Sequence, residues 1–100
     1  MTGPAIRNIV VGVLRDDATP EQAETALAAL RGLRVEGVSY ELRTGLDVGL
    51  RDGNASYALT ADFASEDDYR VYDLDEEHNR IRRELFAPIS ASIQRIQIRL

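Results

Sequence analysis

Near its start the chain reads Ile6-Arg7-Asn8-Ile9-Val10-Val11-Gly12-Val13-Leu14, a run rich in β-branched residues that ends at the charged Arg15-Asp16-Asp17. Such a run predicts a β-strand. Successive side chains of a strand point to opposite faces, and here both sets are apolar: Ile9, Val11 and Val13 on one face, Val10 and Leu14 on the other. A strand of this kind is expected to be buried on both faces. The fold therefore has to supply a cover for each side of it.

The rest of the chain predicts two helical regions and three more strands. Thr19-Pro20-Glu21-Gln22 is typical of a helix start, with Thr19 as the cap and Gln22 completing a capping box. The helix that follows has one apolar face, made of Ala23, Ala26, Leu27, Leu30 and Leu33. Strands are predicted over 38–44, 57–63 and 92–100, where apolar and polar residues alternate.

The second helical region is predicted to begin at the capping residue Ser65, to break around residues 73–76 and to run on to about Pro88 or Ser90. The resulting order, β-α-β-β-α-β, predicts a ferredoxin-like α+β fold. In that fold the helices cover one face of a four-stranded antiparallel sheet. No linker or low-complexity tract interrupts the chain, so we expect a single domain over residues 1–100.

The open face of such a sheet needs a second cover. The same face of another copy is the simplest candidate, because two-fold symmetry makes it self-complementary. This predicts a homodimer through the open sheet face. Against it stand polar residues on one face of other strands, which would suit a solvated sheet on a monomer: Ser39, Glu41, Arg43, Arg95, Gln97 and Arg99.

Composition excludes several classes of function. The chain has no cysteine, which rules out disulfides, zinc–thiolate sites and thiol nucleophiles. Its net charge of −5 argues against nucleic acid or an anionic membrane as a partner. We find neither a secretory pattern nor an apolar run long enough to span a membrane, so we expect a cytoplasmic protein.

Several stretches together resemble the stress-responsive dimeric A/B-barrel (Dabb) family: the opening Ile6–Val11, the helix start 17–22, Ala61-Asp62-Phe63, and then Tyr72 and His78. The resemblance implies a homodimer whose two sheets face each other to form a barrel with the helices outside. Most of the family has no established activity. A few members are polyketide cyclases that close an aromatic ring by an aldol-type condensation without a cofactor, and some plant members are stress-induced proteins that assemble into large rings.

The family typically carries Arg-His on the first strand and Tyr-x-x-His-Pro-x-His between the helical segments. Here Asn8 follows Arg7, and Asp75-Glu76 stands where His-Pro is usual, while Tyr72 and His78 match. The resemblance implies that Tyr72 and His78 are a catalytic pair that polarises the substrate and removes a proton. Their pocket would lie between the sheet and the helices.

Each candidate also has a purely structural interpretation. His78 shares an inward-facing helical stripe with Ile81, Leu85 and Ile89, so it is either a general base or a packed histidine with one hydrogen bond. Tyr72 either donates a hydrogen bond to an enolate or only forms part of the pocket wall.

Three residues of the first strand are candidates for ligand contact. The Asn8 amide could orient a ligand carbonyl in place of the family histidine, or Asn8 could simply sit at the strand entrance. If Gly12 faces the helices with Asn8 and Val10, its missing side chain opens a pocket; the alternative is close helix–sheet packing.

Other charged groups suggest no site. The acidic run around residues 73–77 lacks the glycine of a calcium loop, so we predict no metal there and interpret it as a solvated helix start. Arg80, Arg82 and Arg83 lie at pairing distance from glutamates along the helix, which predicts surface ion pairs.

Three functions remain open. One is a cofactor-independent dimer that binds a small hydrophobic carbonyl or polyketide-like ligand and, if it is an enzyme, acts as a cyclase-like lyase. Another is a non-catalytic, stress-associated assembly protein with a packed interior. The third is a cofactor-free monooxygenase or isomerase of a related dimeric α/β-barrel family.

Overall fold

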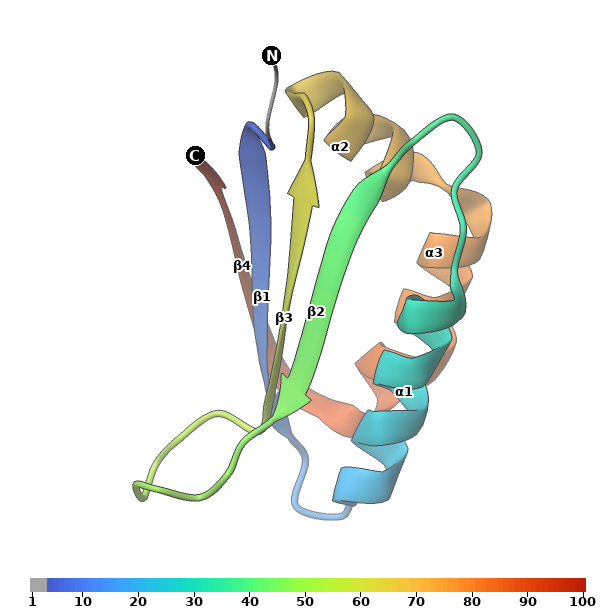
Figure 1. Cartoon of the computed structure of the whole chain (residues 1–100). Coiled ribbons are helices and arrows are strands. Elements are labelled where there is room, and N and C mark those ends of the chain that lie inside the picture. The colour runs from blue at the N-terminus through green and yellow to red at the C-terminus, as the bar shows by residue number, and fades with distance from the viewer. Residues whose placement is uncertain (1–3) are drawn as a thin grey trace.

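The helices of this protein pack on one face of a four-stranded antiparallel sheet and leave the other face open, as Figure 1 shows in a computed structural model. The structure describes residues 4–100, so the first three residues of the expected domain lie outside it. The strands are β1 (Ile6–Leu14), β2 (Tyr40–Leu46), β3 (Tyr57–Phe63) and β4 (Ser90–Arg99), in the spatial order β2-β3-β1-β4. The predicted ferredoxin-like fold is confirmed, with β1 and β3 in the centre.

Helix α1 (Pro20–Gly32) begins as its sequence predicts. The Thr19 hydroxyl accepts a hydrogen bond from the Gln22 backbone N–H at 3.2 Å, and the Gln22 side chain accepts one from the Thr19 N–H at 2.9 Å. This capping box satisfies two N–H groups that would otherwise lack partners at the helix start. The apolar face is buried against the sheet through Ala23, Ala26, Leu27 and Leu30.

The second helical region is more interrupted than its sequence suggests. It consists of α2 (Glu66–Leu74) and α3 (Glu76–Ile81), followed by a π-helical turn (Arg82–Phe86) and a 3₁₀ turn (Ala87–Ile89). Asp75 separates α2 from α3 in an extended conformation, as the predicted break requires. The π-helical turn gives way to the narrower 3₁₀ turn just before Pro88, which has no N–H to continue an α-helix.

Pairing between strands decides which side chains face the helices. Asn8 pairs with Gln97 and Val10 with Arg95, so these β4 residues share the helix-side face of β1. These polar residues of β4 therefore face the helices. The alternative of a solvated sheet on a monomer would require them on the open face. Of the polar residues considered for that face, Glu41 and Arg43 on β2 lie there.

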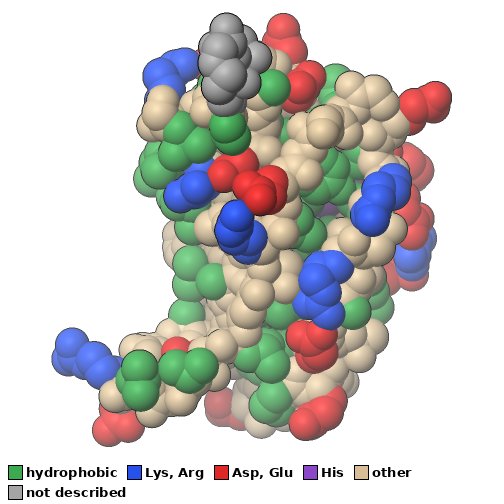
Figure 2. Space-filling model, in the orientation of Figure 1, with side chains coloured by type: hydrophobic (Ala, Val, Ile, Leu, Met, Phe, Trp, Pro, Cys, Tyr) green, Lys and Arg blue, Asp and Glu red, His purple; other side chains and the backbone are tan. Residues whose placement is uncertain are grey.

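The open face is consequently apolar over β1 and β4. Its exposed residues include Val11, Val13, Ile96 and Ile98, with 36–56% of their surface accessible. The loop between β2 and β3 projects beyond this face and exposes two more apolar side chains, Val48 and Leu50 (Figure 1). Figure 2 shows hydrophobic side chains along this edge of the molecule and on the projecting loop. These apolar side chains have no cover within one chain.

On the helix side of β1, the missing side chain of Gly12 lets the Tyr57 ring pack directly against the backbone. A Cβ atom at Gly12 would lie 2.1 Å from the Tyr57 ring. That ring cannot easily move, because Tyr57 is buried and its hydroxyl shares a 2.8 Å hydrogen bond with Ser90. The strand glycine is thus required by its neighbour.

We predict that Gly12→Ala lowers the free energy of unfolding by about 1–3 kcal/mol, the usual range for overpacking a core. Urea denaturation followed by circular dichroism measures it. Gly45→Ala is the matched control: Gly45 also lies in a strand, but a Cβ there meets no atom within 4 Å. Its stability should change by less than about 0.5 kcal/mol. Equal losses in the two variants would contradict the role of the Tyr57 contact.

Candidate functional site

A pocket of about 270 Å³ lies between the helix-side face of the sheet and the second helical region. β1, β3 and β4 form its floor with Asn8, Val10, Leu59, Ile93 and Arg95, among others. The helices and turns above contribute Tyr69, Tyr72, Asp73, His78, Arg82, Arg83 and Phe86. The lining of the pocket is therefore mostly apolar, but it also includes charged side chains.

The break at Asp75 brings Tyr72 and His78 together. The Asp75 backbone N–H donates to the Tyr72 carbonyl at 3.1 Å, closing α2, and its carboxylate accepts from the His78 backbone N–H at 2.9 Å, starting α3. The two rings consequently pack with their centroids 4.2 Å apart. Both side chains are buried and both line the pocket, as expected for the two candidates.

The ionisation of this pair is set mainly by burial. Burial raises the pKa of Tyr72, so its hydroxyl keeps its proton and can donate a hydrogen bond. Burial also lowers the pKa of His78, and the positive charge of Arg82 lowers it further, while Asp73 and Asp75 act in the opposite direction. The imidazole is therefore neutral at pH 7.

One nitrogen of that imidazole has no partner. His78 Nδ1 is buried, and within residues 4–100 it is the sole buried side-chain nitrogen or oxygen that lacks a hydrogen bond. Leaving a buried polar atom unpaired costs about 1–3 kcal/mol, so such atoms are rare and frequently belong to functional sites. A packed histidine that makes one hydrogen bond through its other ring nitrogen would also leave Nδ1 unpaired, so this alternative remains beside that of a general base.

The three candidates on β1 differ. Asn8 and Val10 line the pocket, and the Asn8 side-chain oxygen accepts a 2.8 Å hydrogen bond from Gln97, which leaves its NH₂ group for other partners. Gly12 does not open the pocket, because the Tyr57 ring fills the room above it. That part of the prediction is wrong. Close packing is what the structure has, with the neighbouring strand rather than a helix as the partner.

Sequence reasoning missed the cationic residues of the pocket. Ion pairs were predicted for all three arginines of the second helical region, but within the described chain they occur at Arg80, which binds Glu77 and Glu84. Arg82 and Arg83 line the pocket instead. Arg95 reaches the pocket because the β1–β4 register places it beside Val10. The alternation in β4 shows that Arg95 and Ile96 lie on opposite faces, but only the pairing with β1 shows which face meets the helices.

The described residues hold no cluster of three or more His, Asp or Glu side chains that could bind a metal ion. Over the same stretch, no helix has the length and apolar character needed to cross a membrane. The acidic residues around the break act locally, as Asp75 does in capping α3.

A family model described as the stress responsive A/B barrel domain matches residues 6–98. The chain belongs to this family. No match was found among curated proteins. Among solved structures, this A/B-barrel chain is similar to a dimeric ferredoxin-like protein of unknown function from Thermobifida fusca, with 31% identity, a TM-score of 0.85, and 98% of this chain and 92% of that chain covered.

Two enzymes have similar folds at lower identity. Hydroxynitrile lyase from Passiflora edulis is 18% identical, with a TM-score of 0.80 and coverage of 97% of this chain and 94% of the lyase. SnoaB, a cofactor-independent oxygenase from Streptomyces nogalater, is 15% identical, with a TM-score of 0.73 and coverage of 96% and 92%. At these identities the likeness concerns the fold, on which unrelated chemistries are found.

We predict that His78 makes the A/B-barrel domain less stable as the pH falls. Because its folded pKa lies below the value of about 6.5 in the unfolded chain, the unfolded state binds more protons between these two values. The stability contribution is therefore complete above pH 6.5 and is lost as the pH falls toward the folded pKa. Thermal unfolding at pH 7.5 and pH 5.5 should show a larger drop for the wild type than for His78→Gln.

The chosen pH range keeps this effect separate from the carboxylates. Asp62, Glu66 and Glu77 have pKa values lowered chiefly by hydrogen bonds from arginines, so their contributions are lost at more acidic pH. Identical pH dependence in the wild type and His78→Gln would contradict a buried neutral imidazole.

Proposed function

We propose that this A/B-barrel protein is a homodimer that binds a small hydrophobic carbonyl or polyketide-like compound between its sheet and its helices. The observation that carries the proposal is the pocket of about 270 Å³ at which Tyr72 meets a buried His78 with an unpartnered Nδ1. Ligand sites usually measure about 300–1,000 Å³. The pocket lies just below the lower end of that range, so it suits a small ligand of one or two rings.

The same pair of residues supports a cofactor-free carbon–carbon bond formation. His78 Nδ1 would remove a proton from a carbon next to a ligand carbonyl, and the C–H electron pair would move toward the carbonyl oxygen. The protonated Tyr72 hydroxyl would donate a hydrogen bond to the resulting enolate. The enolate carbon would then attack a second carbonyl of the same ligand, and the imidazolium would return its proton to the new alkoxide. This aldol step leaves an isomer of the substrate and needs no oxidant.

The dimer is supported by the uncovered apolar surface of β1 and β4. A two-fold axis would place Val11, Val13, Ile96 and Ile98 against the same residues of a second copy, with the loop around Val48 and Leu50 reaching past the edge. The similar protein from Thermobifida fusca is described as dimeric. Pairing two open faces in this way closes the barrel expected for the family.

We predict that Val13→Asp converts the dimer to a monomer, because it places a charge in an apolar interface. Sedimentation at micromolar concentration should give a species of twice the 11.1 kDa chain mass for the wild type and a single chain for the variant. Val71→Asp is the control: Val71 is a valine of similar exposure, but it lies on α2, away from the open face. A wild type that sediments as a single chain would overturn the dimer.

We predict that Tyr72→Phe weakens binding of 2-acetylnaphthalene, a neutral aromatic ketone, by about threefold to tenfold, since one hydrogen bond is worth about 0.5–1.5 kcal/mol. Fluorescence titration measures it, with little background because the chain has no tryptophan. Tyr40→Phe is the control: Tyr40 packs on Tyr72, but its hydroxyl bonds to the Leu33 carbonyl and it does not line this pocket.

The chemistry is tested on 2,6-heptanedione, which cyclises by an intramolecular aldol reaction. Acceleration by the wild type and its loss in His78→Gln and Tyr72→Phe would support the cyclase-like activity. Failure of an intact dimer to bind the aromatic ketone would overturn the ligand-binding proposal and favour the assembly function.

A further inference from the structure

Three arginines line the pocket, Arg82, Arg83 and Arg95, and none of them has an acidic partner within the described residues. All twelve basic residues of the chain are arginines, in a protein whose net charge is −5. Within the described residues most of them pair with Asp or Glu: Arg7, Arg15, Arg31, Arg43, Arg70, Arg80 and Arg99. Arg82 and Arg95, which line the pocket from opposite walls, form no ion pair in that part of the chain. Unpaired cations therefore gather at the pocket.

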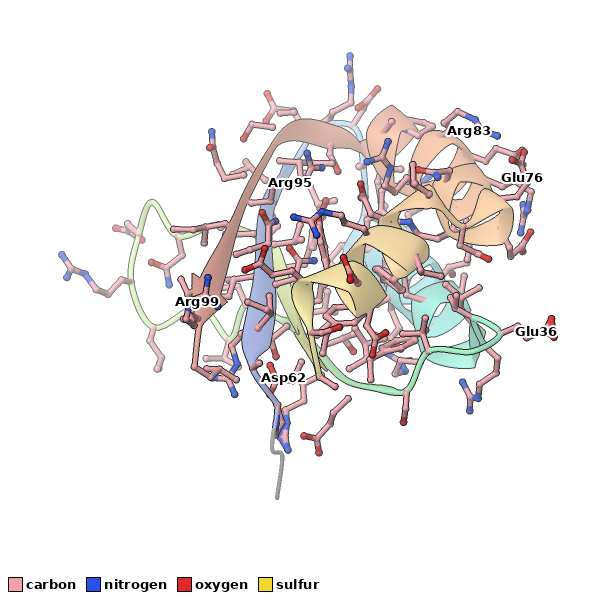
Figure 3. All side chains as sticks on the ribbon, turned by 90° about the horizontal axis from the view of Figure 1, so that it is seen from above. Glu36, Asp62, Glu76, Arg83, Arg95 and Arg99 are labelled. Carbon is pink, nitrogen blue, oxygen red and sulfur yellow. The ribbon has the colours of Figure 1, made fainter. Side chains whose placement is uncertain are left out.

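The charges of Arg82 and Arg95 both act on Tyr69. Burial, and after it the Asp73 carboxylate, raises the pKa of that tyrosine, while Arg95 and Arg82 act in the opposite direction. Arg82 also acts on His78. Figure 3 shows Arg95 on β4, on the side of the sheet that faces the helices. Arg82 and Arg95 thus line one pocket with Tyr69, although they come from segments 13 residues apart in the chain.

Asp73 is the acidic residue that lines the same pocket. Arg82, Arg83 and Arg95, with Asp73, give the lining a net charge of +2 beside an apolar interior formed by Val10, Leu59, Phe86 and Ile93. This net positive charge favours an organic anion over a neutral ligand. Guanidinium groups bind carboxylates with strong, charge-assisted hydrogen bonds.

We propose that Arg82 and Arg95 form a carboxylate subsite in the lining of the pocket. The ligand is then an aromatic or hydrophobic carboxylate, with its apolar body over Val10 and Ile93 and its carbonyl-bearing part directed toward Tyr72 and His78. This rests on the proposed ligand-binding function and narrows its ligand class. The local charge also gives an acidic protein a way to attract an organic anion.

The test compares 2-naphthoate with 2-acetylnaphthalene, two ligands of nearly equal shape that differ in charge. At pH 7 the wild type should bind the carboxylate at least about tenfold more tightly than the ketone, the size expected for charge-assisted hydrogen bonds. Arg82→Gln and Arg95→Gln should each weaken naphthoate about tenfold and leave the ketone within about twofold. Both arginines are exposed, so these variants should fold, which thermal unfolding checks.

Arg34→Gln is the matched control. It removes an exposed arginine that forms no ion pair within the described residues and does not line this pocket. Naphthoate affinity should then change by less than about twofold. Equal affinity of the wild type for the two ligands, or equal weakening by all three arginine variants, would overturn the carboxylate subsite while leaving the ligand-binding function intact. Absence of binding by both ligands would instead overturn the proposed function itself.

Discussion

β1 runs through the middle of the sheet with apolar side chains on both faces, and two different layers have to keep water away from it. The helices form one layer, and their cover is incomplete where Asn8 and Val10 meet the pocket. The other face has no cover within one chain, and Val11 and Val13 stay exposed. Burying apolar surface stabilises by about 25 cal/mol per Å², so an uncovered face of this kind favours association. The proposed dimer and the proposed binding site thus lie on opposite sides of one strand.

A single residue, Asp75, decides the geometry of the candidate site. It ends one helix and caps the next, so the chain turns between Tyr72 and His78 and their rings come into contact. In the family motif His-Pro stands at this point. Here Asp75 caps α3 with its own carboxylate and the helix begins at Glu76. The loss of the family histidines at positions 8 and 75 therefore leaves the Tyr72–His78 pair in place.

The charge distribution of the pocket differs from that of the chain as a whole. Most arginines lie on the surface, where their ion pairs with nearby carboxylates contribute little stability. Arg82 and Arg95 instead line the pocket without an ion pair within the described residues, and His78, whose buried Nδ1 has no partner, lines the same pocket. The exposed guanidinium groups are hydrated, but the unpaired buried nitrogen costs stability, and a ligand that bonds to it would offset that cost. This is a physical reason to expect a function beyond assembly.

Local patterns in the sequence determined the elements of this fold. The capping box at Thr19, the break near residue 75 and the apolar residues on both faces of β1 could each be predicted from residues adjacent in the chain. Tyr72 and His78 were also found, through a motif seven residues long. Tertiary structure alone decided the rest. The register of β4 turned Arg95 inward and Ile96 outward, and the Tyr57 ring filled the space over Gly12. Strand register and ring packing depend on contacts between residues far apart in the chain. A periodic pattern predicts that a strand has two different faces, but it does not predict which face meets the helices.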